Sequence, residues 1–322
     1  MANKLIIDGD LLAYRFAAAV EKRTVIVKHL GSGKEKEYKT RTEFKEFLKK
    51  AGKEFDDEKY SFTDVQTPED ISHAANLVKK MMNRLLEFTG YDEHELYLGG
   101  GETFRHKLSL PVGYKNNRED NLRPIHLTAV RQYMNDVWRA RTVEDYEVDD
   151  VVTIRSYEEH YKGNKPILVS VDKDSYQSQE IRVLNWLEDE WKIVNIPIIG
   201  HLRKDKSSVK GDGLKFLAFQ VLAGDDADTY WGYKLSHLKY GKSYAMKALE
   251  NANTEQEIIN VMVSEYKRLY PEPVTYVDCH GVEVTKNYMQ LLEMYWKVAY
   301  MKRSWNDPSD VYDFCMERGL SI

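Results

Sequence analysis

Two short apolar runs that end in aspartate constrain the fold of this chain most strongly. KLIID at residues 4–8 precedes a helix-forming stretch at 10–20, and PILVSV at 166–171 precedes Asp172. A third run, ELYLG, lies at 95–99, and helical apolar spacing recurs over 68–87, 124–141 and 149–160. Apolar strands that alternate with helices are typical of a largely parallel sheet. The sequence therefore predicts an α/β core over residues 1–200.

The remaining segments predict a hairpin, a pair of edge strands and a helical lobe. Residues 24–29 and 35–40 flank Gly31-Ser32-Gly33, which is a hairpin signal, and 41–62 is charged and peripheral. Thr67 is the predicted cap of the helix at 68–87, with Pro68 at its first position. Residues 181–186 and 191–196 read as an edge pair, and 201–322 as a mainly helical second lobe.

Composition excludes several classes of protein. The 322 residues carry a net charge of −5, which does not decide between partners because basic patches can coexist with a carboxylate cluster. The first 20 residues contain Asp8 and Asp10 and do not resemble a signal peptide. No stretch approaches the roughly 20 apolar residues of a membrane span. Cys279 and Cys315 are too few for a disulfide framework or a cysteine zinc site. These features predict a cytoplasmic protein with no membrane partner.

Carboxylates gather at four places where a strand ends or a helix begins. The acidic candidates are Asp8, Glu147, Asp149, Asp150, Asp172, Asp174, Asp225 and Asp228. Taken singly, each place also fits a helix cap, an Asx turn or a favourable acidic helix start. Ligands bind outside the carboxyl ends of strands in open α/β sheets, so all four places can meet in one cleft. Together they favour a functional site.

Such a cluster is unfavourable without cations, because neighbouring carboxylates raise one another's pKa. Hard oxygen ligands select Mg²⁺ or Mn²⁺, and two such ions stabilise the attacking and leaving oxygens of phosphodiester hydrolysis. The acidic cluster therefore predicts a two-metal phosphodiesterase.

The motifs resemble those of the phage and bacterial 5′-3′ exonuclease and flap endonuclease family, and most closely the T7-type phage exonucleases. LIIDGDLLAYR resembles the first strand of the family, Glu147-Val148-Asp149-Asp150 its Glu-x-Asp-Asp motif, and Asp172-Lys173-Asp174 its Asp-Lys-Asp motif. Two further segments complete the pattern: GDDAD at 224–228, and Phe104-Arg105 with Tyr114-Lys115-Asn116-Asn117-Arg118. The resemblance spans residues 4 to about 250.

The resemblance implies a PIN-like core, a helical arch at about 100–135, an insertion at 21–65, and a duplex-binding module of helix–hairpin–helix type at about 222–250. It implies one ion among the residues that match Asp8, Glu147, Asp149 and Asp150. A second ion would lie near those that match Asp172, Asp174, Asp225 and Asp228.

The arch and the module have implied roles as well. Lys115 and Arg118 would stabilise charge on the scissile phosphate, Arg105 would grip a neighbouring phosphate, and Tyr114 would stack on the terminal base. A solvated basic loop is the alternative for this segment. The module would contact duplex phosphates, and the resemblance allows a K⁺ ion there; its residues would be Lys239, Gly241, Lys242 and Ser243.

The chain departs from the family pattern at two points. The family has an aspartate at the end of the strand before the arch, where this chain reads Leu98-Gly99-Gly100-Gly101, with Glu102 as the nearest acid. The insertion at 21–65 is rich in Lys, Arg and Glu and has no assigned role beyond solvated decoration.

The leading hypothesis is a metal-dependent 5′-3′ exonuclease or 5′-flap endonuclease that acts on DNA, and on RNA of RNA–DNA hybrids, in phage DNA replication. The first alternative is a structure-specific DNA-binding protein with weak or lost cleavage, since one aspartate is missing. The retained carboxylates disfavour it. The second alternative, a toxin-type PIN ribonuclease, is disfavoured by the length of the chain, the arch segment and GDDAD.

Overall fold

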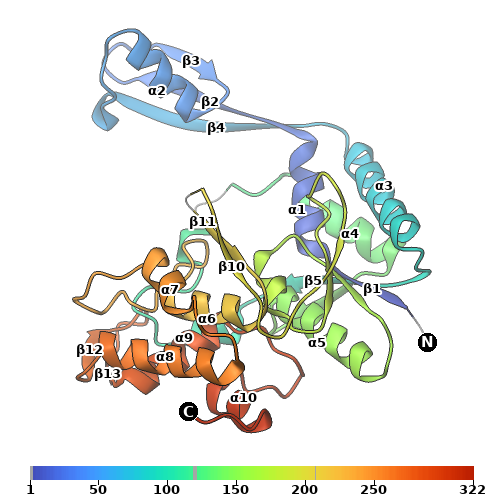
Figure 1. Cartoon of the computed structure of the whole chain (residues 1–322). Coiled ribbons are helices and arrows are strands. Elements are labelled where there is room, and N and C mark those ends of the chain that lie inside the picture. Colours follow the sequence, from blue (N-terminus) through green and yellow to red (C-terminus); the bar gives the residue numbers. More distant parts are fainter. Residues whose placement is uncertain (1–2, 119–121, 207) are drawn as a thin grey trace. The chain divides into compact units, whose positions relative to one another are not determined.

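The computed structural model describes residues 3–118, 122–206 and 208–322 (Figure 1). The chain folds as two compact units. The first comprises Met1–Leu11, Leu86–Asn121 and Arg139–Ile322, and the second comprises Leu12–Leu85 and Leu122–Trp138. These boundaries differ from the predicted division near residue 200, which stays a prediction.

A six-stranded sheet forms the centre of the first unit, in the order β6-β5-β1-β7-β8-β9. Every neighbouring pair in it is parallel except β8 and β9. The strands are β1 (Lys4–Asp8), β5 (Glu93–Gly100), β6 (Arg141–Glu144), β7 (Ile167–Val169), β8 (Arg182–Leu184) and β9 (Ile193–Asn195). The predicted α/β class and parallel sheet are confirmed.

The central strands are apolar because both faces of the sheet are covered. Ile6 in β1 and Leu168 in β7 pack in one cluster with Val151 and Val152 of helix α5 (Val148–Tyr161), and all four side chains are buried. α5 therefore lies against the sheet, with its first turn near the carboxyl ends of the parallel strands. That position brings the acidic Glu147–Asp150 segment to the edge where Asp8 ends β1.

The rest of the first unit is mainly helical. The apolar run at 214–222 lies in α6 (Gly213–Ala223), which packs with α8 (Glu255–Leu269) and α9 (Tyr288–Ala299) around buried Trp296 and Tyr266. Thr254 starts α8 with a capping box that includes Glu257. Shorter elements complete this part: α7 (Lys242–Ala248), α10 (Val311–Glu317), and the antiparallel pairs β10 (Leu202–Asp205) with β11 (Ser208–Gly211) and β12 (Val274–Val277) with β13 (Glu283–Lys286).

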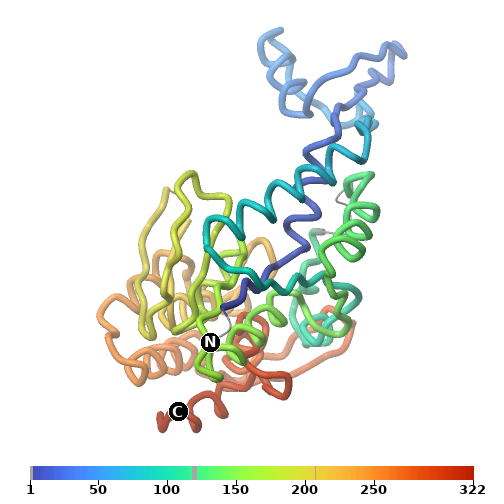
Figure 2. The backbone as a smooth tube through the Cα atoms, turned by 90° about the vertical axis from the view of Figure 1, so that its right-hand side faces the viewer, coloured from blue at the N-terminus to red at the C-terminus, as the bar shows by residue number. Residues whose placement is uncertain are grey.

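The second unit contains the insertion, which folds as a small domain with its own core. Strand β2 (Glu21–His29) pairs with β3 (Glu35–Tyr38) and β4 (Tyr60–Pro68), and α2 (Arg41–Lys50) packs Phe44 and Leu48 on Val25 and Val27. The segment can be followed in blue in Figure 2. α1 (Gly9–Ala19) leads into it, α3 (Ile71–Thr89) follows it, and α4 (Leu127–Trp138) belongs to the same unit.

Two local predictions differ from the structure. β4 runs through Pro68, so α3 begins at Ile71 rather than at 68, and Asp70 in place of Thr67 accepts the Ser72 N–H at 2.8 Å. Pairing with β2 extends the backbone here, and that tertiary contact outweighs the local cap signal. The short hairpins after residue 200 were also missed. Across the described residues, no helix is both long and apolar enough to cross a membrane.

Candidate active site

The four acidic segments each reach the site from the end of an element. Asp8 ends β1, and its Oδ1 accepts the Asp10 N–H at 3.0 Å and the Leu11 N–H at 3.4 Å. Asp172 caps the 3-10 turn η4 (Lys173–Gln177) by accepting the Asp174 N–H at 3.0 Å. These contacts are the helix cap and the Asx turn that were the alternative interpretations of the two motifs. Asp8 and Asp172 therefore make local turn contacts and also belong to the acidic site.

A first group consists of three carboxylates that act on one another electrostatically: Asp8, which is buried, and Asp149 and Asp172, which are half-buried. Burial, followed by the charges of Asp10 and Asp172, raises the pKa of Asp8 to about 7. Burial and the charges of Asp172 and Asp8 likewise raise the pKa of Asp149 well above its usual value. Within the protein these groups cannot all ionise at low energetic cost, because like charges repel in a desolvated site.

A second group joins the first through Asp172. One carboxylate oxygen each from Asp174, Asp225 and Asp228 lies within 4.8 Å of the others, and all three residues are buried. Burial and the charge of Asp172, then those of Asp228 and Asp225, raise the pKa of Asp174. A buried all-oxygen donor set whose members destabilise one another fits a hard divalent cation, which would neutralise them.

Cationic side chains compensate part of this charge. Lys115 Nζ lies 2.5 Å from Glu147 Oε1 and 3.9 Å from Asp228 Oδ1. Burial opposes the charge of Lys115, but Glu147 and Asp228 outweigh it and raise its pKa. Lys173 forms an ion pair with Asp225. Lys115 adopts φ = 56°, a left-handed conformation that is uncommon outside glycine.

Arg105 lies beneath the acidic residues and is fully buried. Nη1 donates to Asp150 Oδ2 at 2.5 Å and to Glu147 Oε2 at 2.9 Å, and Nη2 donates to Asp150 Oδ1 at 3.0 Å. Nε and Nη2 also donate to the carbonyls of Val298 (3.0 Å) and Tyr300 (2.6 Å). A guanidinium has five N–H donors, and these contacts use all five.

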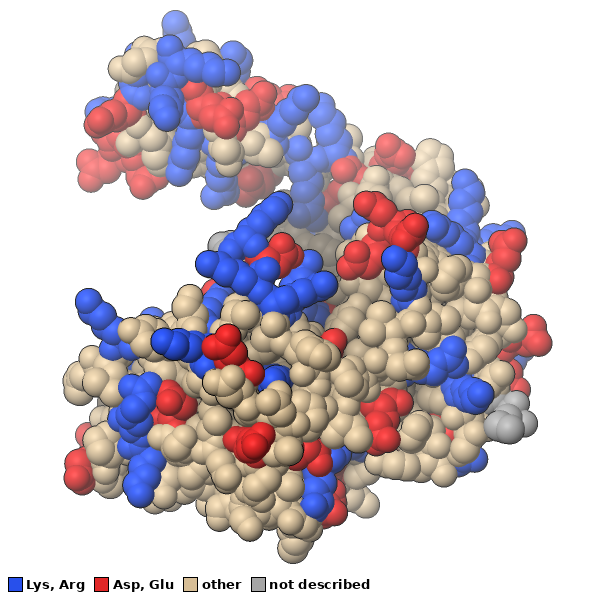
Figure 3. Space-filling view, viewed as in Figure 1, with Lys and Arg blue, Asp and Glu red and all other residues tan. Residues whose placement is uncertain are grey.

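The predicted duplex-binding residues lie on α7 and just before it. Gly241 precedes α7, whose Lys242 Nζ forms an ion pair with Asp226 Oδ2 at 2.6 Å, while Lys239 and Ser243 are exposed. Lys242 is therefore linked to the GDDAD loop. Basic side chains also gather over the β10–β11 hairpin (Figure 3). In the register of this hairpin, Arg203 on β10 lies opposite Lys210 on β11.

Comparison with solved structures gives matches to nucleases of bacteriophage T5. A T5 protein co-crystallised with metal ions is 14% identical, with coverage of 94% of this chain and 89% of that chain at a TM-score of 0.50. A mutant T5 5′-exonuclease is 12% identical, with coverage of 94% and 88% and a TM-score of 0.48. A T5 flap endonuclease in a pseudo-enzyme-product complex with DNA and metal ions is 13% identical, with coverage of 83% and 85% and a TM-score of 0.47.

The chain has the fold of the phage T5 5′-exonuclease. That fold is PIN-like, as predicted. No protein-family model and no curated protein matches the sequence.

Within this 5′-exonuclease fold, three predicted roles do not fit the contacts. Arg105 has no donor left for a phosphate, so we reassign it to positioning Asp150 and Glu147. Tyr114 is buried, and its hydroxyl donates to Glu147 Oε2 at 3.0 Å, which leaves no ring face for a base. Both oxygens of Asp150 are engaged by Arg105, and Oδ1 also accepts the Lys302 N–H at 3.0 Å, so Asp150 faces away from the cation groups.

The other predicted site residues have different outcomes. Asp174, Asp225 and Asp228 form one cluster, Lys115 pairs with Glu147 and lies near Asp228, and Asp8, Asp149 and Asp172 act on one another electrostatically. The side chain of Arg118 lies outside the described residues. Gln220 was missed: its Nε2 donates to Asp174 Oδ1 at 2.5 Å, and the signal was a lone buried amide in the apolar run of α6. No role of its own was predicted for Lys173, which forms an ion pair with Asp225.

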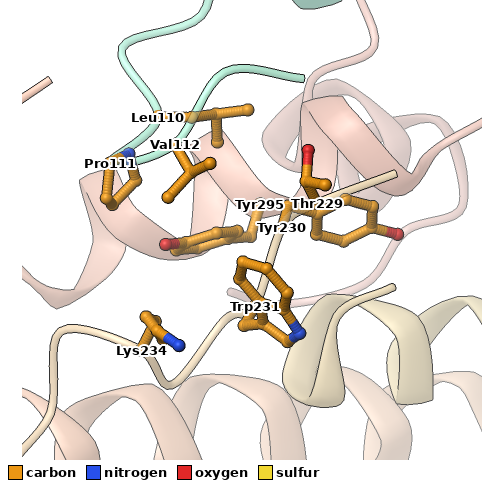
Figure 4. A pocket seen from close by; sticks show the side chains of 8 residues that line it. All are labelled: Leu110, Pro111, Val112, Thr229, Tyr230, Trp231, Lys234 and Tyr295. Atoms are coloured by element: carbon orange, nitrogen blue, oxygen red, sulfur yellow. The ribbon is translucent and has the colours of Figure 1, made fainter. Parts of the chain in front are cut away.

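A small pocket lies outside this site (Figure 4). It is lined by residues 110–112 and 229–231 together with Lys234 and Tyr295, and its volume is about 10 Å³. A space of this size holds about one water molecule. It is therefore a packing gap beside the GDDAD loop and cannot accept a nucleotide.

The GDDAD loop depends on a glycine backbone. Gly224 has φ = 78° and ψ = −174°, a region that is essentially restricted to glycine. A Cβ at this position would lie 2.1 Å from the Tyr230 carbonyl oxygen. The Asp225 N–H donates to that same oxygen at 2.8 Å and closes the loop. The glycine thus permits the turn that places Asp225 and Asp228.

We expect Gly224→Ala to lower the free energy of unfolding by about 1–3 kcal/mol from backbone strain, with a further cost from the clash. Gly163→Ala is the matched control, because Gly163 also has a positive φ (80°) but a Cβ there would meet nothing within 4 Å. Urea denaturation followed by circular dichroism measures both variants. Equal losses of unfolding free energy in the two variants would contradict the clash at Gly224. An unchanged free energy of unfolding in Gly224→Ala would contradict both the clash and the backbone strain.

Proposed function

We propose that this protein is a divalent-metal-dependent 5′ nuclease that hydrolyses DNA phosphodiesters at a 5′ end or a 5′ flap. The observation that carries the proposal is the buried cluster of Asp174, Asp225 and Asp228, linked electrostatically through Asp172 to Asp8 and Asp149, with the Lys115 ammonium beside it. Buried carboxylates that raise one another's pKa have no structural advantage in a protein that only binds DNA.

The residues take distinct roles in this proposal. Asp8, Asp149 and Asp172 would hold one Mg²⁺ or Mn²⁺, and Asp174, Asp225 and Asp228 the second. When bound, the two cations supply charge stabilisation for the attacking and leaving oxygens of an in-line displacement. Lys115 presents a protonated ammonium at the same edge, where it can neutralise developing negative charge on a phosphate. Glu147 holds Lys115, and Arg105 and Tyr114 hold Glu147.

The substrate side of the proposal rests on charge. Lys242, Lys239 and the basic β10–β11 hairpin offer contacts to duplex phosphates that are independent of sequence. Cleavage of RNA in RNA–DNA hybrids, K⁺ at the duplex-binding module, a role in phage DNA replication and a host-cytoplasmic location belong to the same proposal. They follow from the family resemblance of the motifs.

Digestion of a 5′-labelled blunt duplex and a 5′-flap substrate with Mg²⁺ tests the function. We expect Asp149→Asn to reduce cleavage by about 10²–10³-fold, the loss typical of one preorganised electrostatic contact. The variant should still bind the flap in fluorescence anisotropy without Mg²⁺. Asp92→Asn, an exposed acid, should cleave like the wild type.

The products also separate the two candidate functions. Mononucleotides from the duplex indicate exonuclease activity, and oligonucleotides from the flap indicate endonuclease activity. Intact substrate with tight wild-type binding would instead support the structure-specific DNA-binding protein.

A further inference from the structure

The side chain of Gln220 lies deep in the protein and contacts a proposed cation ligand. Gln220 is 2% exposed in the mainly apolar helix α6. Its Nε2 donates to Asp174 Oδ1 at 2.5 Å, and Asp174 belongs to the buried cluster with Asp225 and Asp228. A buried amide needs partners for its donors and its acceptor, whereas an apolar side chain at this place in the helix would need none. Core packing therefore does not account for a glutamine here.

A second buried glutamine, Gln177, sets the direction of the Gln220 amide. Gln177 Oε1 accepts the Met301 N–H at 3.0 Å, and its Nε2 donates to the Ala299 carbonyl at 2.9 Å. Backbone groups cannot exchange the roles of donor and acceptor, so these contacts fix which end of the Gln177 amide is the nitrogen. The same Nε2 donates to Gln220 Oε1 at 3.4 Å. The nitrogen of Gln220 must then face Asp174, where an ionised carboxylate can only accept.

Asp174 is held at its backbone and at its carboxylate by two different groups. Its N–H donates to Asp172 Oδ1 at 3.0 Å, which fixes the main chain in η4. The hydrogen bond from Gln220 fixes the rotation of the carboxylate, and with it the direction of both oxygens. Because an amide is neutral, this contact leaves the negative charge of Asp174 to a cation, unlike the ammonium of Lys173 beside Asp225. A neutral donor is therefore suited to hold a ligand without competing with the cation.

We propose that Gln220 is a positioning residue that orients the Asp174 carboxylate toward a cation in the cluster of Asp174, Asp225 and Asp228, and that Gln177 acts through Gln220. The inference rests on the proposed function, because it assumes a cation in that cluster. The backbone at the end of α9 would thus be connected to the cation site through two side-chain amides.

Calorimetric titration of the metal-free full chain with Mn²⁺, without DNA, tests the assignment. Gln220→Met removes the donor to Asp174 and keeps a side chain of similar length. We expect it to weaken Mn²⁺ binding by about 10–100-fold, the loss typical when the hydrogen-bond partner of a metal ligand is removed. The weakened site should be the one that Asp225→Asn also weakens. Gln177→Met should weaken the same site by a smaller factor, because it frees the Gln220 amide to rotate without removing it.

Gln179→Met is the matched control for the loss of a buried amide. Gln179 is 1% exposed, and its Nε2 donates to the backbone carbonyl of Ile198 at 2.6 Å. This variant loses buried hydrogen bonds as Gln220→Met does, but it should bind Mn²⁺ like the wild type. Thermal unfolding in EDTA checks that all variants are folded. The double variant Gln177→Met/Gln220→Met should bind Mn²⁺ no more weakly than Gln220→Met, because residues that act through one another are not additive.

The outcomes separate the inference from the proposed function. Wild-type Mn²⁺ affinity in folded Gln220→Met, or equal losses in Gln220→Met and Gln179→Met, would overturn the role of Gln220 and leave the nuclease proposal standing. If Gln220→Met does not fold, wild-type affinity in folded Gln177→Met would overturn it instead. Additive losses in the double variant would overturn the action of Gln177 through Gln220. A wild-type chain that binds no Mn²⁺ would overturn both proposals.

Discussion

Replacing Arg105 with methionine is expected to lower the free energy of unfolding by about 3–5 kcal/mol, the cost of breaking a buried ion pair by removing one partner. Asp150 is fully buried and receives two N–H bonds from Arg105. Without them its charge stays in the protein interior, where, among the residues that the structure describes, the Lys302 amide is the one remaining donor. The carbonyls of Val298 and Tyr300 would also lose their donors.

Urea denaturation at pH 7.5 measures this loss. Two further variants show whether the loss comes from the broken ion pair. Arg203→Met, at an exposed arginine of β10, should change the free energy of unfolding by less than about 0.5 kcal/mol. Arg105→Met combined with Asp150→Asn should recover part of the loss, because removing both charges leaves no unpaired ion. A double variant less stable than Arg105→Met would show that Asp150 is stabilised by other groups.

Replacing Asp8 with asparagine is expected to stabilise the metal-free protein at neutral pH. The pKa of Asp8 is raised from 3.8 to about 7, so between these values the folded state binds a proton that the unfolded state releases. Stability therefore falls as pH rises through this window, and the full cost is present above pH 7. Three units correspond to about 4 kcal/mol at 1.36 kcal/mol per unit, an order-of-magnitude figure.

The gain from Asp8→Asn should be near that value at pH 8 in EDTA and should vanish below pH 4. Thermal and urea unfolding across pH 3.5–8 measure it, with Asp92→Asn as an exposed control. Saturating Mg²⁺ should reverse the order, because a cation stabilises the carboxylate of the wild type and the amide of the variant much less. A gain independent of pH would show that the Asp8 charge is not its source.

The strands and helices of the core could be predicted from local pattern. β1, β5, β7, α5 and α6 are marked by apolar runs together with their lengths and flanking residues, and their predicted positions agree with the structure to within a few residues. β4 could not be predicted, because YSFTDVQTP is stabilised by pairing with β2 and not by its own composition. The short edge strand β6 was missed for the same reason.

The composition of the candidate site could also be predicted, whereas the direction of its side chains could not. Asp8, Asp149, Asp172, Asp174, Asp225 and Asp228 follow from position at strand ends and helix starts. Arg105 and Tyr114 were expected to face the substrate, since a basic and aromatic segment resembles a phosphate-binding loop. The tertiary structure turns both inward, where burial makes hydrogen bonds to carboxylates far stronger than in water.

The amino-acid sequence by itself determined the fold class and the acids available for a cation, because apolar periodicity and residue chemistry are local properties. Only the tertiary structure decided that Arg105 supports the site instead of binding the substrate, and that Gln220 donates to Asp174. Both depend on contacts between residues far apart in the chain, 46 positions for Gln220 with Asp174 and 195 for Arg105 with Tyr300. Local pattern does not encode such contacts; packing of the sheet and helices creates them.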